Sequence, residues 1–368
     1  MTSLRSLGKR LFLSFVAVGL TLVVLELACR IRAAIYENRE AAAFRKLAHA
    51  KPPKAGADVG LGRMIRLSRH TKVVYELIPD LSVRLRGTRV STDSNGFRRI
   101  RPEPREELSS VAILGLGDSF MFGWGVNDDQ CYLAHLNTWL RKQDPHRGWN
   151  VLNMAVPGYN TVMQIELLKT KGLSFNPRLV IIHYVVNDLD LPNFIGKEDS
   201  MWTLKRFFLK ETFSRKFSFR YNGLNRLVDV PFDVEAGRYR FQEDHIPAKY
   251  RDLVGLDAYL QAMHELKELG RQHGFEIIVL ADLRPPDYVV DMCAAEGLTL
   301  VTTREAVHRH LLQQGFSRHD KSDLVLSATD SHPSVNGHRL LADALIQELE
   351  SGNYLERLIN NSAGVRPD

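Results

Sequence analysis

One apolar stretch that ends in a glycine-rich turn, residues 111–125, constrains the fold of this chain most. It reads VAILGLGDSFMFGWG, and its mostly apolar first half has the character of a buried strand. The run ends in Gly117, Asp118 and Ser119. Glycine permits a tight turn at this point, and Asp118 is suited to cap a following helix. In an open α/β sheet, ligands bind outside the carboxyl ends of the strands, so Ser119 is expected at a functional edge.

Strand and helix signals alternate after this turn. Helical periodicity covers residues 132–140 and 162–171, and apolar strands are expected at 149–156 and 179–186. The further elements expected are strands at 275–283 and 298–302 and a last helix at about 334–350. This alternation predicts an α/β fold with a parallel sheet of about five strands and right-handed crossovers. The 368 residues, 44% of them hydrophobic, suffice for a sizeable core.

The amino terminus contains a long apolar segment. Residues 11–29 are almost entirely apolar, and the segment is about long enough to cross a bilayer. Three basic residues precede it, which predicts a cytoplasmic amino end at residues 1–10, although Arg30 and Arg32 behind it reduce the asymmetry. A cleaved signal peptide is the alternative, but no clean small-x-small cleavage site follows. We expect a membrane anchor and an extracytoplasmic domain, periplasmic or at the cell surface.

Composition and turn signals divide the remaining chain. The segment behind the anchor is rich in Ala, Lys, Arg and Pro, which predicts a short helix and a spacer. Strand-like alternation follows, broken by turn residues at Pro79-Asp80 and Asn95-Gly96, and predicts a β ribbon. The expected order is a spacer at 30–62, the β ribbon at 63–105, the main domain at 106–352 and a polar tail at 353–368.

An insertion without strand signals, residues 189–250, interrupts the main domain. Aromatic and basic side chains are interleaved in part of it, WTLKRFFLKETFSRKFSFRY. This pattern fits an amphipathic helix with Leu204, Phe208 and Phe217 against the core. It also fits a surface for a polysaccharide, a membrane or single-stranded nucleic acid. Its place above the carboxyl ends of the strands makes it a candidate lid or substrate wall.

Composition argues against several other classes. The formal net charge is +6, but acidic and basic residues are interspersed through most of the sequence, so no nucleic-acid partner is expected. Cys29, Cys131 and Cys293 are too few and too scattered for a disulfide framework or a metal cluster. We expect neither a metal nor another cofactor, and the sequence leaves the oligomeric state open.

Chemically useful residues follow the later strands or precede the last helix. Gly158 follows the second strand, Asn187 follows the third, and Asp330 and His332 precede the last helix. Ester chemistry by a serine needs a base, a group that orients the base, and donors for the developing oxyanion. His332 is the candidate base, and Asp330 is its candidate orienting carboxylate. The candidate oxyanion donors are the backbone N–H groups of Ser119 and Gly158 and the side-chain amide of Asn187.

The order of these residues resembles that of the SGNH hydrolases, also called GDSL-type esterases and lipases. Their blocks match Gly117-Asp118-Ser119, then Gly158, then Val185 to Asp188, and finally Asp330 with His332. The resemblance covers about residues 110–351. It implies a flavodoxin-like three-layer α/β/α sandwich and a triad of Ser119, His332 and Asp330. It also implies an oxyanion hole formed by Ser119, Gly158 and Asn187.

Two positions depart from the family pattern. Val185 stands where the third block usually has glycine, which is expected to narrow the oxyanion pocket and to leave Asn187 in place. One residue separates Asp330 from His332 where two are commoner, a spacing similar to that of some alginate O-acetyltransferase relatives. The Gly-x-Ser-x-Gly elbow of the α/β-hydrolases is absent, which disfavours that family of serine esterases.

Three functional hypotheses follow. The leading one is a membrane-anchored serine esterase or acyltransferase that acts on O-acyl esters, chiefly O-acetyl esters, of an envelope or exported polysaccharide. The second is a lipase or thioesterase-type hydrolase of lipid acyl esters, in which the insertion receives an acyl chain or headgroup. The third is an envelope scaffold or carbohydrate-binding protein that keeps the fold without turnover. Hydrolase and transferase share all the residues named, because they differ only in whether water or a sugar hydroxyl attacks the acyl-enzyme.

Overall fold

A five-stranded parallel sheet forms the centre of the molecule in a computed structural model of the whole chain. The structure describes residues 2–47, 51–103, 110–192, 202, 207–210 and 248–360. The strands lie in the order β10-β9-β8-β6-β7. Their bounds are β6 Ser110–Leu116, β7 Gly148–Asn153, β8 Pro177–Tyr184, β9 Glu276–Ala281 and β10 Thr299–Thr302. Counted along the chain this is the 2-1-3-4-5 order of flavodoxin-like folds, so the predicted fold class is confirmed.

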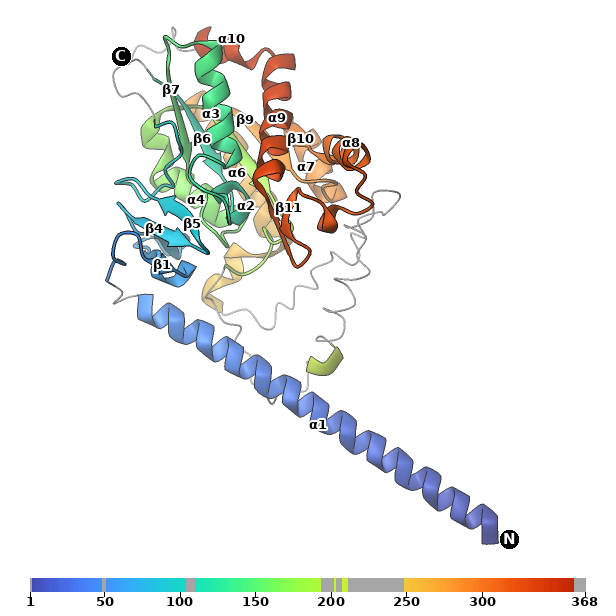
Figure 1. Cartoon of the computed structure of the whole chain (residues 1–368). Helices are drawn as coiled ribbons and strands as arrows, with labels where there is room; N and C mark the ends of the chain where they lie inside the picture. The colour runs from blue at the N-terminus through green and yellow to red at the C-terminus, as the bar shows by residue number, and fades with distance from the viewer. Residues whose placement is uncertain are drawn as a thin grey trace.

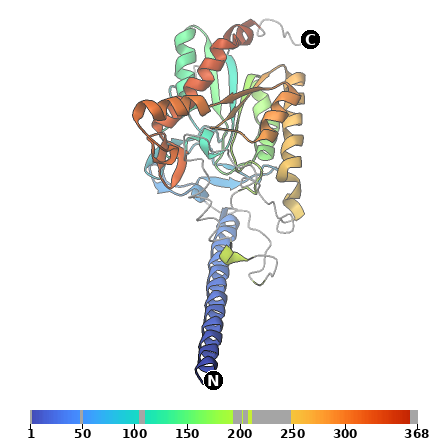
Figure 2. The ribbon, with the colours of Figure 1, turned by 90° about the vertical axis from the view of Figure 1, so that its right-hand side faces the viewer.

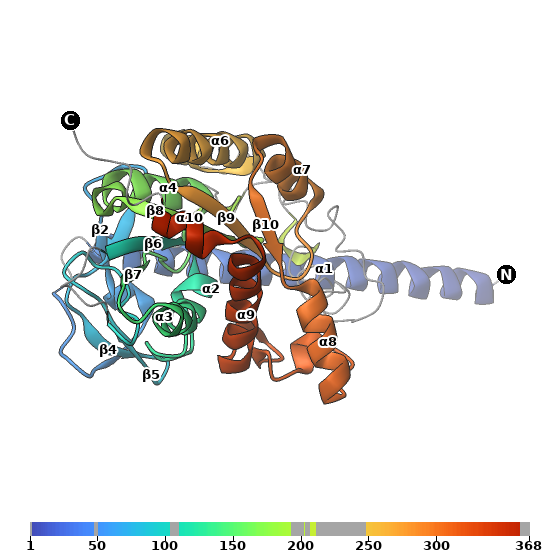
Figure 3. The same ribbon diagram turned by 90° about the horizontal axis from the view of Figure 1, so that it is seen from above.

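Helices cover both faces of the sheet and produce three layers (Figure 1). In Figure 3, α4, α6 and α7 lie on one side of the strands, and α3 and α9 lie on the other. The helices are α3 Tyr132–Gln143, α4 Thr161–Thr170, α6 Gly255–His273, α7 Asp287–Glu296, α8 Arg304–Gln314 and α9 Val335–Ser351. Short 3-10 turns are η2 Gly172–Phe175, η5 Ala248–Leu253 and η6 His319–Lys321.

Apolar side chains fill the space between these layers. Leu114 on β6 and Ile181 on β8 are fully buried, because helices cover the central strands on both faces. Helix α9 presents a buried stripe, Leu341, Leu345 and Leu349, whose spacing of four residues keeps it on one face of the helix. Burial of such stripes fixes the helices on the sheet and holds the loops at the strand ends in place.

The strand order reverses between β6 and β8, and the predicted site residues follow these two strands. Helix α2 (Ser119–Phe122) begins three residues after the last residue of β6, and Asn187 comes shortly after β8. Connections from the two strands leave in opposite directions at such a reversal and open a crevice, where ligands bind in open α/β sheets. The topology therefore brings Ser119 and Asn187 to the same edge.

A single long helix, α1 (Thr2–Leu47), contains the predicted anchor. Its segment Gly8–Ile35 is long and apolar enough to cross a membrane and is not buried within the molecule. The segment is longer than the predicted 11–29, and a signal sequence near the amino terminus shares these properties. In Figures 1 and 2 this helix projects away from the α/β core.

Two small sheets, rather than one ribbon, precede the core. Strands β1 (Asp58–Val59), β4 (Ser82–Leu85) and β5 (Thr88–Ser91) form one, and β2 (Ile65–Leu67) and β3 (Tyr75–Leu77) form the other. We call this region, residues 51–103, the β extension; it also contains the 3-10 turn η1, Leu61–Arg63. It begins before the predicted residue 63, because β1 pairs in parallel with β4. The sequence did not predict β1, because a strand of two residues is too short to show an alternation of apolar and polar side chains.

The segment predicted as a polar tail, residues 353–368, contains a short helix. Residues Tyr354–Asn360 form helix α10. Tyr354 and Leu358 are buried, since their spacing of four residues places both on one helical face. The hydroxyl of Tyr354 also donates to Oγ1 of Thr299, at 2.8 Å.

Most of the predicted insertion lies outside the described residues. Leu204 and Phe217, two of the three residues expected on the apolar face of its helix, are among the undescribed positions. Phe208 is described and buried, and the backbone N–H groups of Phe208 and Leu209 donate to the carboxylate of Glu26 on α1. The amphipathic helix and the lid therefore stay predictions.

Candidate active site

Ser119 lies at the turn between β6 and α2. Asp118 caps α2, since its carboxylate accepts a hydrogen bond of 2.9 Å from the backbone N–H of Phe120. Gly117 lies so close to Met121 that a Cβ atom added at position 117 would be 2.6 Å from Cβ of Met121. The turn expected from the sequence is therefore present, and it brings Ser119 to the carboxyl edge of the sheet.

Asp330 and His332 lie on a hairpin outside the main sheet, formed by β11 (Val325–Ser327) and β12 (Asp330–Pro333). Alternate residues of a strand point to the same face, so side chains two positions apart lie side by side. Nδ1 of His332 is 2.6 Å from Oδ1 of Asp330, and Nε2 of His332 is 2.8 Å from Oγ of Ser119. The structure thus brings Ser119, from near the start of the core domain in sequence, together with Asp330 and His332, from near its end.

The hydroxyl of Ser119 has two acceptors within reach. Its Oγ lies 2.8 Å from Nε2 of His332 and 3.2 Å from Oδ2 of Asp118. When Nδ1 of His332 donates to Asp330, Nε2 carries no proton and accepts one from the serine. A serine bonded to an imidazole that a carboxylate orients is the arrangement that activates a serine nucleophile.

The environment of Asp330 favours its ionised form. Burial raises the pKa of Asp330, but hydrogen bonds from His332 and Arg86 outweigh burial and hold that pKa below its usual value. The ring of Trp124 stacks on His332 with centroids 5.7 Å apart and planes at 30°. The imidazole is therefore positioned by a carboxylate at one edge and by an aromatic ring against its face.

The predicted oxyanion donors border the same space as Ser119. Gly158 has a φ of +81°, in the left-handed region that favours glycine. Nδ2 of Asn187 donates to Oδ2 of Asp118 at 3.1 Å. Ser119 is the first residue of α2, where a helix leaves its N–H group without an intrahelical acceptor. Ser119, Gly158, Asn187 and His332 all line one cavity.

This cavity has a volume of about 620 Å³, within the range of sites for small molecules. Its apolar lining residues include Leu61, Phe120, Trp124, Val185 and Leu283, and its charged or titratable ones include Asp282, Arg284, His319 and Asp320. Val185, which stands where the SGNH hydrolases usually have glycine, is thus part of the wall; that it narrows the pocket stays a prediction.

Comparison with known proteins found similarity only in structure. No family model and no curated protein matches the sequence. Solved structures similar to this chain include esterases. A two-domain esterase active on acetylated mannans is 13% identical, with 70% of this chain and 51% of that protein covered and a TM-score of 0.41. This chain therefore spans about half the length of that esterase.

Two further solved structures are similar to this chain over almost their whole length. An acetylxylan esterase from Geobacillus stearothermophilus is 17% identical, with 67% of this chain and 96% of that one covered and a TM-score of 0.40. A protein of the G-D-S-L family from Desulfitobacterium hafniense is 13% identical, with 64% of this chain and 97% of that one covered and a TM-score of 0.38.

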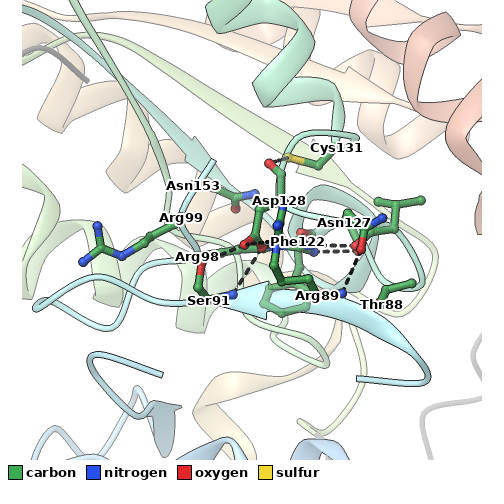
Figure 4. A network of polar contacts seen from close by, with 12 residues as sticks. Thr88, Arg89, Ser91, Arg98, Arg99, Phe122, Asn127, Asp128, Cys131 and Asn153 are labelled. Atoms are coloured by element: carbon green, nitrogen blue, oxygen red, sulfur yellow. Dashed lines mark hydrogen bonds and ion pairs between the residues drawn. The ribbon is translucent and has the colours of Figure 1, made fainter. Parts of the chain in front are cut away.

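A buried arginine of the β extension holds the loop after α2 (Figure 4). Arg98 lies 3.5 Å from the carboxylate of Asp128, and both side chains are fully buried. The guanidinium donates to three backbone oxygens of the loop, those of Phe122, Gly123 and Val126. This loop carries Trp124, so Arg98 supports the ring that stacks on His332.

The β extension also supports the loop that carries Gly158. The hydroxyl of Tyr75, on β3, donates to the backbone oxygen of Pro157 at 3.0 Å. The hydroxyl of Tyr159 donates in return to the backbone oxygen of Tyr75. Both tyrosines are fully buried. Contacts from outside the predicted main domain thus fix the position of the loop at Gly158.

A second chain of polar contacts, which the sequence did not indicate, reaches the cavity wall at Asp282. Nδ1 of His183 is 3.0 Å from the hydroxyl of Tyr132, and Nε2 is 3.2 Å from Oδ1 of Asp282 in the cavity wall. His183 is fully buried, and a buried imidazole needs partners for its nitrogens. These contacts supply both partners and join α3 to the cavity wall.

Arg86 and Trp124 contact the candidate triad but were not predicted. Arg86 approaches Asp330 from 244 positions away, and Trp124 touches His332 only through the tertiary fold. The sequence offers one signal, the Arg86-Gly87 pair, which suits a tight turn but does not indicate what that turn faces.

Proposed function

We propose that this chain is a membrane-anchored serine esterase or acyltransferase that acts on O-acyl esters through Ser119, His332 and Asp330. The observation that carries the proposal is the continuous contact from Oγ of Ser119 to Nε2 of His332 and from Nδ1 of His332 to Asp330. The supporting observation is a cavity of about 620 Å³ that opens on this serine. The sequence blocks of the SGNH hydrolases favour the same reaction.

The proposed reaction has two stages. His332 takes the hydroxyl proton at Nε2 while Oγ of Ser119 attacks the acyl carbon, and the N–H groups of Ser119 and Gly158 and the amide of Asn187 stabilise the oxyanion. The protonated imidazole then gives its proton to the departing alcohol, and an acyl-serine remains. Water or a sugar hydroxyl attacks this ester after losing its proton to His332, and Ser119 leaves with a proton.

For the substrate we propose O-acetyl esters of an envelope or exported polysaccharide. The apolar helix α1 favours an anchored enzyme with its domain outside the cytoplasm, where such polymers occur. The resemblance to SGNH hydrolases favours acyl groups on sugar hydroxyls. Mass spectrometry of envelope glycans from cells with and without the protein tests this choice, and we expect altered O-acetyl content.

Hydrolysis of lipid acyl esters is the second candidate, because the cavity exceeds the space that an acetyl group needs. Leu61, Phe120 and Leu283 line it and are suited to contact an acyl chain. Rates on matched esters with two-carbon and eight-carbon acyl groups separate the candidates. A preference for the two-carbon ester supports the acetyl substrate, and a preference for the longer ester supports the lipid substrate.

The test of the reaction itself is hydrolysis of a chromogenic acetyl ester by the full-length protein in detergent. Ser119→Ala is expected to reduce kcat/KM by at least about 10³-fold, because only the remaining oxyanion donors and binding contacts then act. Ser174→Ala, the same change on an exposed residue of η2, is the matched control. Equal rates for wild type and Ser119→Ala would exclude the triad, and inactivity on a broad ester panel would favour a binding protein or scaffold.

A further inference from the structure

The turn between β4 and β5 brings a cation to the candidate triad from the β extension. Nη1 of Arg86 lies 2.6 Å from Oδ2 of Asp330, and the other carboxylate oxygen, Oδ1, lies 2.6 Å from Nδ1 of His332. Each oxygen of Asp330 therefore has its own charged or polar partner. We propose that Arg86 is a positioning residue that fixes Asp330, and through it His332; this inference rests on the proposed function.

The position of Arg86 in its turn is unusual. Leu85 pairs with Thr88, so Arg86 and Gly87 form a two-residue hairpin loop. Both have positive φ, 52° and 82°, the signature of a type I′ turn, where Asn-Gly or Gly-Gly is favoured. An arginine in the left-handed region is disfavoured by its Cβ atom. The turn thus carries an unfavourable residue whose side chain reaches the acid of the candidate triad.

The hairpin that carries Asp330 and His332 is bonded by a residue of the β extension. Among the strands that the structure describes, β11 and β12 pair only with each other, so no strand of the main sheet fixes Asp330. The guanidinium of Arg86 bonds this hairpin and also lies 5.8 Å from the ring of Trp124, which stacks on His332. Arg86 therefore contacts both groups that hold the imidazole in place.

The loss of Arg86 would lower Tm if its role were purely structural, and it would lower kcat if Arg86 positions Asp330. The side chain of Arg86 is 54% exposed, and exposed ion pairs contribute little to folding stability. A positioning role predicts that the loss of Arg86 lowers kcat and leaves KM and Tm nearly unchanged. Arg84, an exposed residue of β4 on the same hairpin, provides a control with the same loss of charge.

The experiment compares Arg86→Gln, Arg86→Lys and Arg84→Gln in the full-length protein with an acetyl ester. We expect Arg86→Gln to lose between about tenfold and a hundredfold in kcat, since an ångström of misplacement costs up to about 10²-fold. We expect Arg86→Lys to recover part of the loss and added guanidinium to restore part of the rate of Arg86→Gln. Arg84→Gln is expected to behave as wild type in the same assay. Unchanged kcat in Arg86→Gln, or equal losses in Arg86→Gln and Arg84→Gln, would overturn the inference.

A measurement without turnover separates this inference from the proposed function. The proton between Nδ1 of His332 and Asp330 is expected to give a downfield proton NMR signal that Asp330→Asn removes. We expect Arg86→Gln to shift or broaden this signal and Arg84→Gln to leave it unchanged, whether or not the protein hydrolyses esters. A signal identical in wild type and Arg86→Gln shows that Arg86 does not position Asp330. Activity that is insensitive to Ser119→Ala overturns the proposed function instead.

Discussion

His338, on α9, is a fully buried imidazole whose ring nitrogens make no hydrogen bond within the described part of the chain. Its ring lies against Tyr132, with centroids 5.8 Å apart. Burial, followed by the positive charge of Arg98, holds the pKa of His338 well below its usual value. The folded protein therefore keeps His338 neutral, whereas the unfolded chain binds a proton near pH 6.5.

The sign of the resulting pH dependence follows from proton linkage. Below about pH 6.5 the unfolded state binds more protons than the folded state, so the free energy of unfolding falls as the pH falls. For one such histidine the slope reaches up to about 1.4 kcal/mol per pH unit. We expect His338→Phe to flatten the decline of stability between about pH 6.5 and pH 5.

Urea unfolding at several pH values checks this expectation. His264→Gln is the control, because His264 is exposed and its hydrogen bond with Glu296 raises the pKa of its imidazole. Loss of this histidine is therefore not expected to flatten the decline of stability on acidification. The account of His338 fails if the wild type and His338→Phe lose stability in parallel on acidification.

The geometry of strand β12 explains why Asp330 and His332 can be separated by a single residue. The one-residue separation of Asp330 and His332 works because both lie on β12, where positions i and i+2 share a face. A glycine inserted after Ser331 restores the commoner two-residue spacing but moves Asp330 to the opposite face. We expect this insertion to lower kcat by at least about 10²-fold.

The control is a glycine inserted after Ala328, in the turn between β11 and β12. It lengthens the loop and leaves the spacing of Asp330 and His332 unchanged. Steady-state kinetics on an acetyl ester compares the two insertions. If the insertion after Ser331 is the more active of the two, the strand explanation is incorrect.

The sequence predicted the elements that carry strong local signals. The five core strands and the turn at Ser119 follow from apolar runs that end in glycine and polar residues, and parallel strands necessarily share a carboxyl edge. This is why Ser119 and Asn187 could be assigned to one edge before the fold was known. His332 lies on a hairpin outside this sheet, and it was assigned to the same site from its place before the last helix and from the resemblance to SGNH hydrolases. Helix α10 was missed because seven residues beyond a glycine give little periodic signal.

Other contacts depended on how distant segments pack. The ion pair of Arg86 with Asp330 spans 244 positions, and Arg98 finds its acceptors in a loop more than 20 residues away. Neither arginine has a local pattern that distinguishes it from a solvated surface residue. Buried arginines are rare, so sequence reasoning places them at the surface by default.

The whole molecule joins an apolar helix, the β extension and the α/β core. The core domain predicted at residues 106–352 omits the β extension, yet Arg98 and Tyr75 support the site from there, and Leu61 lines the cavity. The boundary of the active unit is therefore proposed to lie before residue 61. In Figure 1 the β extension lies between the core and the carboxyl end of α1.

Truncation tests this boundary. A chain of residues 51–368 is expected to fold and to hydrolyse a soluble acetyl ester at the rate of the full-length protein. A chain of residues 106–368 is expected to aggregate or to be inactive, because it lacks Arg98 and Tyr75, which hold the loops that carry Trp124 and Gly158. Circular dichroism and the ester assay report the two outcomes. Full activity in the shorter chain would show that the β extension is dispensable.

Covalent labelling tests the central claim, that Ser119 is a nucleophile activated by His332. A fluorophosphonate reacts when an activated serine attacks phosphorus and fluoride leaves, so the adduct identifies the nucleophile by mass. We predict one adduct per chain, located by peptide mapping at Ser119, and none in His332→Ala under the same conditions. An adduct at another residue, or equal labelling of Ser119 with and without His332, would contradict the account.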